Sequence, residues 1–127
     1  MKKTSMILCG MMLLASSAMA QVKVIAHRGH WNSQGAAQNS IAAMQNAKKA
    51  DVWGSEFDVH ITTDGTVVVN HDDDIHGIII ENAKYADIKN LKLANGEPIA
   101  TLKSYLEAGK KLAPMQLILE IKAHQTP

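Results

Sequence analysis

The chain has 127 residues, enough for one small domain, and its 13 basic and 12 acidic residues give a formal net charge of +1. It contains no basic stripe, internal repeat or low-complexity tract, so composition gives no indication of binding to nucleic acid or to an anionic membrane surface. The single cysteine, Cys9, excludes a disulfide within the chain.

The first twenty residues have the three parts of a secretory signal peptide. Lys2 and Lys3 precede an apolar stretch at 6–15, and Ala18-Met19-Ala20 forms a small-residue cleavage site. The stretch is shorter than the roughly 20 residues of a membrane-spanning helix. A buried N-terminal helix is the alternative, but the segment has neither caps nor a polar face. We therefore expect export to the periplasm or cell exterior, with a mature chain, 21–127, that keeps 107 of the 127 residues.

The mature chain begins with a predicted strand and a predicted helix. The run 22–27 is mostly apolar and ends in a polar cluster, as is typical of a buried strand. In 40–50, apolar residues recur at helical spacing, and Asn39 or Ser40 stands where a helix cap is expected. We therefore predict a helix over 40–50 that ends near Asp51.

Residues 54–72 contain the most informative pattern. Apolar and polar side chains alternate up to residue 61, as in a strand, and a second β-branched run follows the strong turn signal Asp64-Gly65. A parallel crossover needs about a dozen residues, which this stretch lacks, so we predict a hairpin. Closure at Asp64-Gly65 would place Asp58 almost opposite His71, whereas a slip of one residue would put them on different faces.

The remaining residues complete an α/β pattern. An excursion over 72–100 contains a short predicted helix around Tyr85 and a turn at Asn95-Gly96. Thr101 can cap a further helix, and 115–123 alternates as a strand with Glu120 and Lys122 off its apolar face. Strands that alternate with helices indicate the α/β fold class.

Three carboxylates, Glu56, Asp58 and Glu120, lie off the apolar faces of their predicted strands. Glu56 and Asp58 are about 7 Å apart along the strand and can reach one ion. Like charges in a partly dry site are tolerated chiefly around a cation, and oxygen-only ligands indicate magnesium or calcium rather than zinc. The alternative is that Glu56 and Asp58 form the solvent-exposed face of an antiparallel strand, but the pattern recurs on the strand that carries Glu120.

Two histidines and two basic residues accompany the acids. His27 and His71 each close an apolar run, and a histidine can exchange its proton near neutral pH. Arg28 presents a planar fork suited to phosphate oxygens, and Lys122 adds a second positive charge. The pattern indicates displacement at phosphorus near a cation. It also allows purely structural histidines, and it assigns no role to the other four.

Four ordered motifs together resemble the glycerophosphodiester phosphodiesterase family. They are AHRGH at 26–30, QNS at 38–40, GSEFDVHITTDGTVVVNHD at 54–72 and LILEIK at 117–122. The resemblance implies a phospholipase-C-like (β/α)8 TIM barrel that hydrolyses glycerophosphodiesters to glycerol 3-phosphate and an alcohol. It also implies roles for seven residues: Glu56, Asp58 and Glu120 would bind a divalent cation, His27 and His71 would be acid and base, and Arg28 and Lys122 would bind phosphate.

Two features depart from this family pattern. The family usually has Pro-Glu-Asn where this chain has Ala37-Gln38-Asn39, and Gln38 offers no charge, so we do not include it among the metal ligands. A (β/α)8 barrel typically needs about 250 residues, so 21–127 is expected to be the N-terminal half of one domain. The open alternatives are a phospholipase-type activity on lysophospholipid or inositol lipid, and a non-catalytic module that binds metal or phosphodiester.

Overall fold

The computed structural model describes residues 20–125, so the expected signal peptide, except for Ala20, lies outside the described residues. The described chain is built around a four-stranded sheet with the long strand β2 at its centre. Two strands pair with β2 in parallel and one pairs antiparallel. The strands are β1 (Ile25–Ala26), β2 (Gly54–Ile61), β3 (Val67–Val69) and β6 (Gln116–Ile121).

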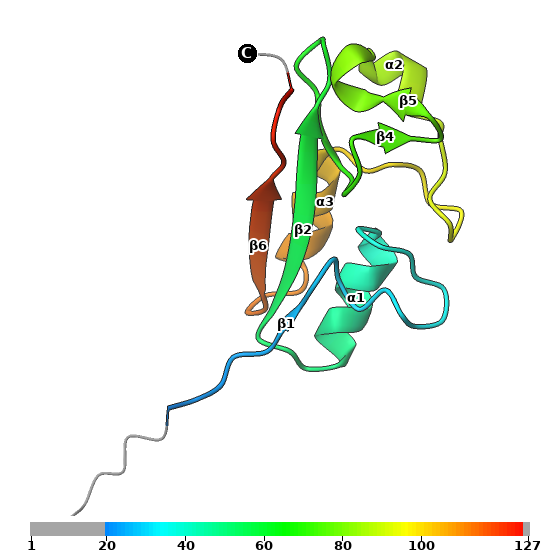
Figure 1. Cartoon of the computed structure of the whole chain (residues 1–127). Helices are drawn as coiled ribbons and strands as arrows, with labels where there is room; N and C mark the ends of the chain where they lie inside the picture. Colours follow the sequence, from blue (N-terminus) through cyan, green and yellow to red (C-terminus); the bar gives the residue numbers. More distant parts are fainter. Residues whose placement is uncertain (1–19, 126–127) are drawn as a thin grey trace, which may run out of the picture.

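The central strand β2 pairs with three neighbouring strands along different parts of its length. Strand β6 pairs with β2 along the whole stretch from Gly54 to Val59 and so occupies one edge. On the other edge, β1 pairs with Gly54 and Ser55, and β3 takes over from Val59 to Ile61. Figure 1 shows β6 and β1 on opposite sides of β2. The parallel strands β1, β2 and β6 therefore bring their carboxyl ends toward the same edge of the sheet.

Two capped helices connect the parallel strands. Helix α1 (Ile41–Lys49) begins after Ser40, whose side chain accepts a hydrogen bond from the Ala43 amide. Helix α3 (Leu102–Lys110) begins after Thr101, which accepts from the Ser104 amide. Both predicted helices are thus confirmed with their caps. The Glu97 carboxylate also accepts from the first two amides of α1, at 3.1 and 3.2 Å, where negative charge suits the helix dipole.

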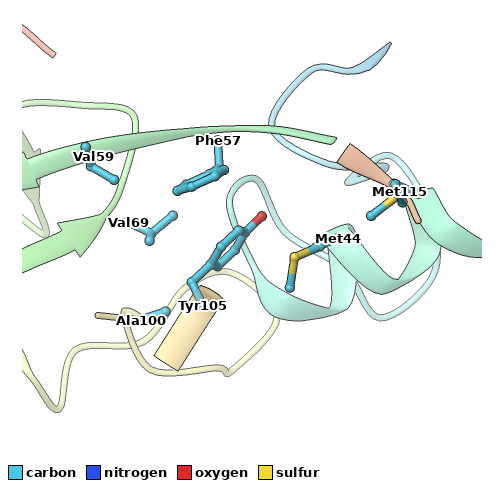
Figure 2. Close-up of a cluster of buried hydrophobic side chains, with 8 residues drawn as sticks. Met44, Phe57, Val59, Val69, Ala100, Tyr105 and Met115 are labelled. Carbon is cyan, nitrogen blue, oxygen red and sulfur yellow. The ribbon is translucent and has the colours of Figure 1, made fainter. Parts of the chain in front are cut away.

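One face of β2 packs against these helices. Phe57 and Val59 lie over Met44 of α1 and Tyr105 of α3, and the rings of Phe57 and Tyr105 have centroids 4.6 Å apart (Figure 2). The opposite, inner face carries the even-numbered residues of β2. Every residue from Gly54 to His60 is buried, so β2 is covered on both faces. The alternative that Glu56 and Asp58 form a solvent-exposed face is therefore wrong.

A compact excursion separates β3 from α3. It consists of β4 (Asp74–Ile75), β5 (Ile78–Ile79), a 3-10 turn (Ile80–Asn82) and α2 (Tyr85–Ile88). The predicted short helix and the turn at Asn95-Gly96 are confirmed. The β4–β5 pair was not predicted because two-residue strands are too short to show an alternation.

Two expectations about the strands are wrong. The run 22–27 forms a strand only at Ile25–Ala26, and Val22 and Val24 are 87% and 56% exposed because no described segment packs over them. The predicted hairpin exists, but Val59 pairs with Val69, which places Asp58 opposite Asn70 rather than His71. The turn contains one more residue than the two-residue type expected.

Among residues 20–125, no helix has the length and apolar character needed to cross a membrane.

Candidate active site

The three carboxylates predicted from the sequence converge at one point on the inner face. Glu56 and Asp58 are two residues apart on β2, and Glu120 is the parallel partner of Asp58 on β6. One oxygen from each carboxylate lies within 4.8 Å of the others. Carboxylate oxygens this close together are the ligands that a hard divalent cation prefers, so these three residues could hold one.

Asp58 is the buried anchor of this cluster. Its side chain is fully buried, and Asn39 binds it reciprocally: the Asn39 amide donates to Oδ2 at 2.9 Å, and Oδ1 of Asn39 accepts from the Asp58 backbone at 3.1 Å. Lys122 Nζ lies 3.0 Å from Oδ1. Burial raises the pKa of Asp58, but the hydrogen bonds from Asn39 and Lys122 outweigh it and hold the pKa below its usual value. Asp58 is therefore held as an anion.

Glu56 is tied to the end of β1. Its Oε2 accepts from the Arg28 amide at 2.8 Å, and His27 Nε2 lies 3.9 Å from the same oxygen. Its Oε1 is buried and has no hydrogen-bond partner among residues 20–125. A buried carboxylate oxygen without a partner is costly unless a cation neutralises it, so the residues present fit a hard divalent ion.

Lys122 lies at the carboxyl end of β6 between two of the acids. Its Nζ is 2.7 Å from Oε1 of Glu120 and 3.0 Å from Asp58, and its side chain is 20% exposed. The hydrogen bond to Glu120, supported by the one to Asp58, raises the pKa of Lys122 above its usual value. Lys122 therefore places a positive charge beside the carboxylates.

Arg28 links the first loop to the rest of the site. Its guanidinium donates to Gln38 Oε1 and to His71 Nε2, both at 2.7 Å, and its Nε lies 3.9 Å from Asp58. The backbone reaches this position through two residues with positive φ, Arg28 at 58° and Gly29 at 77°. A Cβ on Gly29 would lie 2.6 Å from the Cβ of Ala43, so glycine is required for the approach to α1.

The two histidines follow different strands, His27 directly after β1 and His71 two residues after β3. His71 Nδ1 lies 2.7 Å from Asp72 Oδ1 and its Nε2 faces Arg28. An arginine can only donate, so Nε2 of His71 accepts and Nδ1 carries the proton donated to Asp72. His27 follows β1 beside Glu56, and its side chain is 66% exposed. The structure thus brings together all seven residues selected from the sequence.

A cavity of about 520 Å³ opens beside this group. Its lining includes His71, Lys122 and Gln125, together with three consecutive aspartates, 72–74. Its volume is in the range of small-molecule sites, and it borders both a candidate acid–base residue and a candidate phosphate ligand.

Several residues of the site have no clear signal in the sequence. Asn39 was considered only as a helix cap, yet its positive φ of 59° turns its side chain onto Asp58. Gln38 contacts Arg28 rather than the carboxylates, consistent with its omission from the metal ligands. Asp72 partners His71, and His60 Nε2 lies 3.1 Å from the His71 carbonyl oxygen. Only for His60 did the sequence contain a signal, because it continues the alternation of Glu56 and Asp58.

Comparisons with known proteins agree with this geometry. Residues 27–126 match the model of the glycerophosphoryl diester phosphodiesterase family. A crystal structure of a glycerophosphodiester phosphodiesterase from Parabacteroides distasonis is 50% identical, with a TM-score of 0.81 over 83% of this chain and 44% of that chain. An Oleispira antarctica phosphodiesterase in complex with sn-glycerol-3-phosphate is 30% identical, with a TM-score of 0.69 over 80% of this chain and 44% of that chain.

Curated relatives give the same picture over shorter stretches. A glycerophosphodiester phosphodiesterase from Caldanaerobacter subterraneus is 44% identical over 52 residues, which is 41% of this chain and 21% of the relative. A human lysophospholipase D is 37% identical over 71 residues, 56% of this chain and 22% of the relative. The matched stretches therefore span about a fifth of these two relatives, and the described α/β fold corresponds to roughly half of a TIM barrel.

Proposed function

This chain belongs to the glycerophosphoryl diester phosphodiesterase family, and on that premise we propose that it contributes a metal-dependent site that hydrolyses glycerophosphodiesters to glycerol 3-phosphate and an alcohol. The observation that carries the proposal is the convergence of Glu56, Asp58 and Glu120 on one point. The positive charge of Lys122 and two histidines near the same carboxylates support it.

The carboxylates would hold a divalent cation, Mg²⁺ or Ca²⁺, and both ions suit an all-oxygen ligand set. When bound, such an ion polarises a phosphoryl oxygen and lowers the pKa of an attacking hydroxyl. The chain's own contribution is to hold three acids together while Asn39 and Lys122 keep Asp58 charged.

Arg28 and Lys122 would bind the phosphate, and His27 and His71 would move protons. One imidazole takes the proton of the attacking hydroxyl, which belongs either to water or to the 2-hydroxyl of the glycerol. The other imidazole protonates the oxygen of the leaving alcohol. Asp72 supports this role for His71 because it fixes the proton on Nδ1 and leaves Nε2 as the accepting atom.

The direct test uses the intact gene product that contains this chain. Glycerophosphocholine or glycerophosphoethanolamine, with added Mg²⁺ or Ca²⁺, is expected to yield glycerol 3-phosphate, and a chelator is expected to abolish the release. His27→Ala and His71→Ala should lower turnover strongly but keep metal binding. Metal and diester binding without any turnover would instead identify a non-catalytic binding module.

A lysophospholipid is the second candidate substrate, since the matched human relative is a lysophospholipase D. Comparing head-group release from water-soluble diesters with release from lysophospholipid or inositol lipid micelles separates the two activities. If micellar lipids are turned over faster than water-soluble diesters, the protein is a phospholipase-type enzyme and the first proposal is wrong.

We also propose that residues 1–20 direct export to the periplasm or cell exterior, since they have the charge and apolar pattern of a signal peptide. Mass spectrometry of the protein recovered outside the cytoplasm should find Gln21 as the first residue. Recovery of the uncleaved chain from the cytoplasm would contradict this.

A further inference from the structure

His71 lies outside the ladder that holds the strand residues of the site. The β2–β3 ladder ends at Val69, and the last backbone bond to β2 runs from the Asn70 amide to the Asp58 carbonyl at 3.0 Å. Continued alternation would direct His71 to the helix-packed face of the sheet. Its imidazole instead reaches Arg28 on the inner face. Contacts other than strand pairing must therefore hold the backbone at His71.

His60 makes one such contact. It lies on the inner face of β2, in alternation with Glu56 and Asp58, and is only 9% exposed. Its Nε2 is 3.1 Å from the carbonyl oxygen of His71. Because a carbonyl oxygen can only accept, Nε2 of His60 carries the proton in this bond.

Asn70 provides the second contact. Its side-chain amide donates to the carbonyl oxygens of Asp72 at 2.8 Å and Asp74 at 3.0 Å. Side-chain donors therefore hold the backbone carbonyls of the segment from His71 to Asp74. Of these bonds, the one from His60 is made to the backbone of His71 itself.

We propose that His60 is a positioning residue for His71: its hydrogen bond to the His71 carbonyl fixes the turn that directs the His71 imidazole toward Arg28 and Asp58. The inference rests on the proposed function, in which His71 exchanges a proton with the substrate or the attacking hydroxyl. The His60 ring nitrogen contacts the backbone of His71 rather than its imidazole. Its effect should therefore appear in turnover rather than in substrate affinity.

The test compares His60→Gln with His60→Met in the intact gene product. Both replacements are unbranched and of similar length, but only glutamine keeps a donor near the position of Nε2. We expect His60→Met to lower kcat about 10-fold, with KM within about twofold, as for the loss of one buried hydrogen bond. His60→Gln should recover most of that loss. His76→Asn is the control, because His76 also contacts a backbone oxygen, that of Lys92, but is exposed and outside the site.

A double-mutant cycle separates positioning from general damage. If His60 acts through His71, adding His60→Met to His71→Ala should cause no further fall in kcat. Equal losses in both backgrounds would overturn the proposal, as would His60→Met with wild-type kcat. If His60→Met does not fold, His60→Asn replaces it, because asparagine keeps an amide that is too short to reach the carbonyl.

Failure of the proposed function gives a different result. In that case the wild-type protein has no phosphodiesterase activity, and the side-chain NMR signals of His71 provide the readout. His60→Met should shift them and His60→Gln should not. Unchanged His71 signals in both variants would overturn the positioning role.

Discussion

Replacing Glu56 by glutamine tests the carboxylate cluster directly. Glutamine keeps the shape of the side chain and an oxygen that can accept from the Arg28 amide, but it removes one of three negative charges. Because the two partners of Asp58 and the caps of α1 are untouched, the metal-free protein should unfold within a few degrees of the wild-type temperature.

The expected loss of metal affinity follows from Coulomb's law. At a typical calcium–oxygen distance of about 2.4 Å, a divalent ion gains about 3.5 kcal/mol from one carboxylate charge even at the dielectric constant of water, which corresponds to about 300-fold in Kd. The neutral amide oxygen recovers part of this energy, whereas the partly buried position of Glu56 increases the loss. We therefore expect Glu56→Gln to weaken Mg²⁺ or Ca²⁺ binding by about 100-fold or more.

The assay is calorimetric titration of the intact gene product with each metal chloride, together with the metal-induced rise in melting temperature. Glu107→Gln is the matched control, because Glu107 is an exposed glutamate on α3 whose partner is Lys103. A Kd for Glu56→Gln within threefold of the wild-type value would show that the three carboxylates do not share an ion, whatever the effect on catalysis.

Three further predictions concern the support of the site. Asn39→Ala removes both hydrogen bonds to Asp58 and should lower the free energy of unfolding, measured in urea, by about 2–3 kcal/mol. Asn32 is exposed, so the control Asn32→Ala should leave this free energy nearly unchanged. Gly29→Ala should lower the free energy of unfolding by about 2–4 kcal/mol, because φ is positive and the new Cβ would collide with Ala43. Gly35 has the same φ of 77° but open space around it, so Gly35→Ala should cost about 1 kcal/mol. Equal losses in the two variants would refute the steric argument. The pKa of Asp58 in the folded state is below its usual value of 3.8. Its charge should therefore stabilise the fold above that pH, and this contribution should decline as the pH falls below it. The difference in free energy of unfolding between wild type and Asp58→Asn should accordingly narrow in acid.

Most of the helices and strands could be predicted because they depend on local patterns, and these patterns together with the family resemblance selected seven residues that the structure brings together. Ser40 and Thr101 start their helices as their hydroxyl caps predict, and the alternation in β2 places Glu56 and Asp58 on one face. Glu120 joins them because β6 pairs with β2 in parallel, a long-range contact that the separate patterns allow but do not specify.

The sequence was insufficient where the backbone leaves regular structure. The turn of the hairpin has one residue more than expected, so Asn70 rather than His71 lies opposite Asp58. In that register, simple alternation along the strand would place His71 on the face away from the site. His71 reaches Arg28 because the chain leaves the ladder after Asn70. Asn39 was missed for a related reason: a left-handed backbone conformation at a non-glycine residue has no periodic signal.

Glu97, which lies far along the chain from α1, caps the start of that helix. Glu97 holds the amides of Ile41 and Ala42, two residues beyond the asparagine that fixes Asp58. A surface turn and the most buried acid of the molecule therefore depend on the same short piece of backbone. A substitution at Glu97 is therefore expected to disturb the backbone next to Asn39 as well as the start of α1.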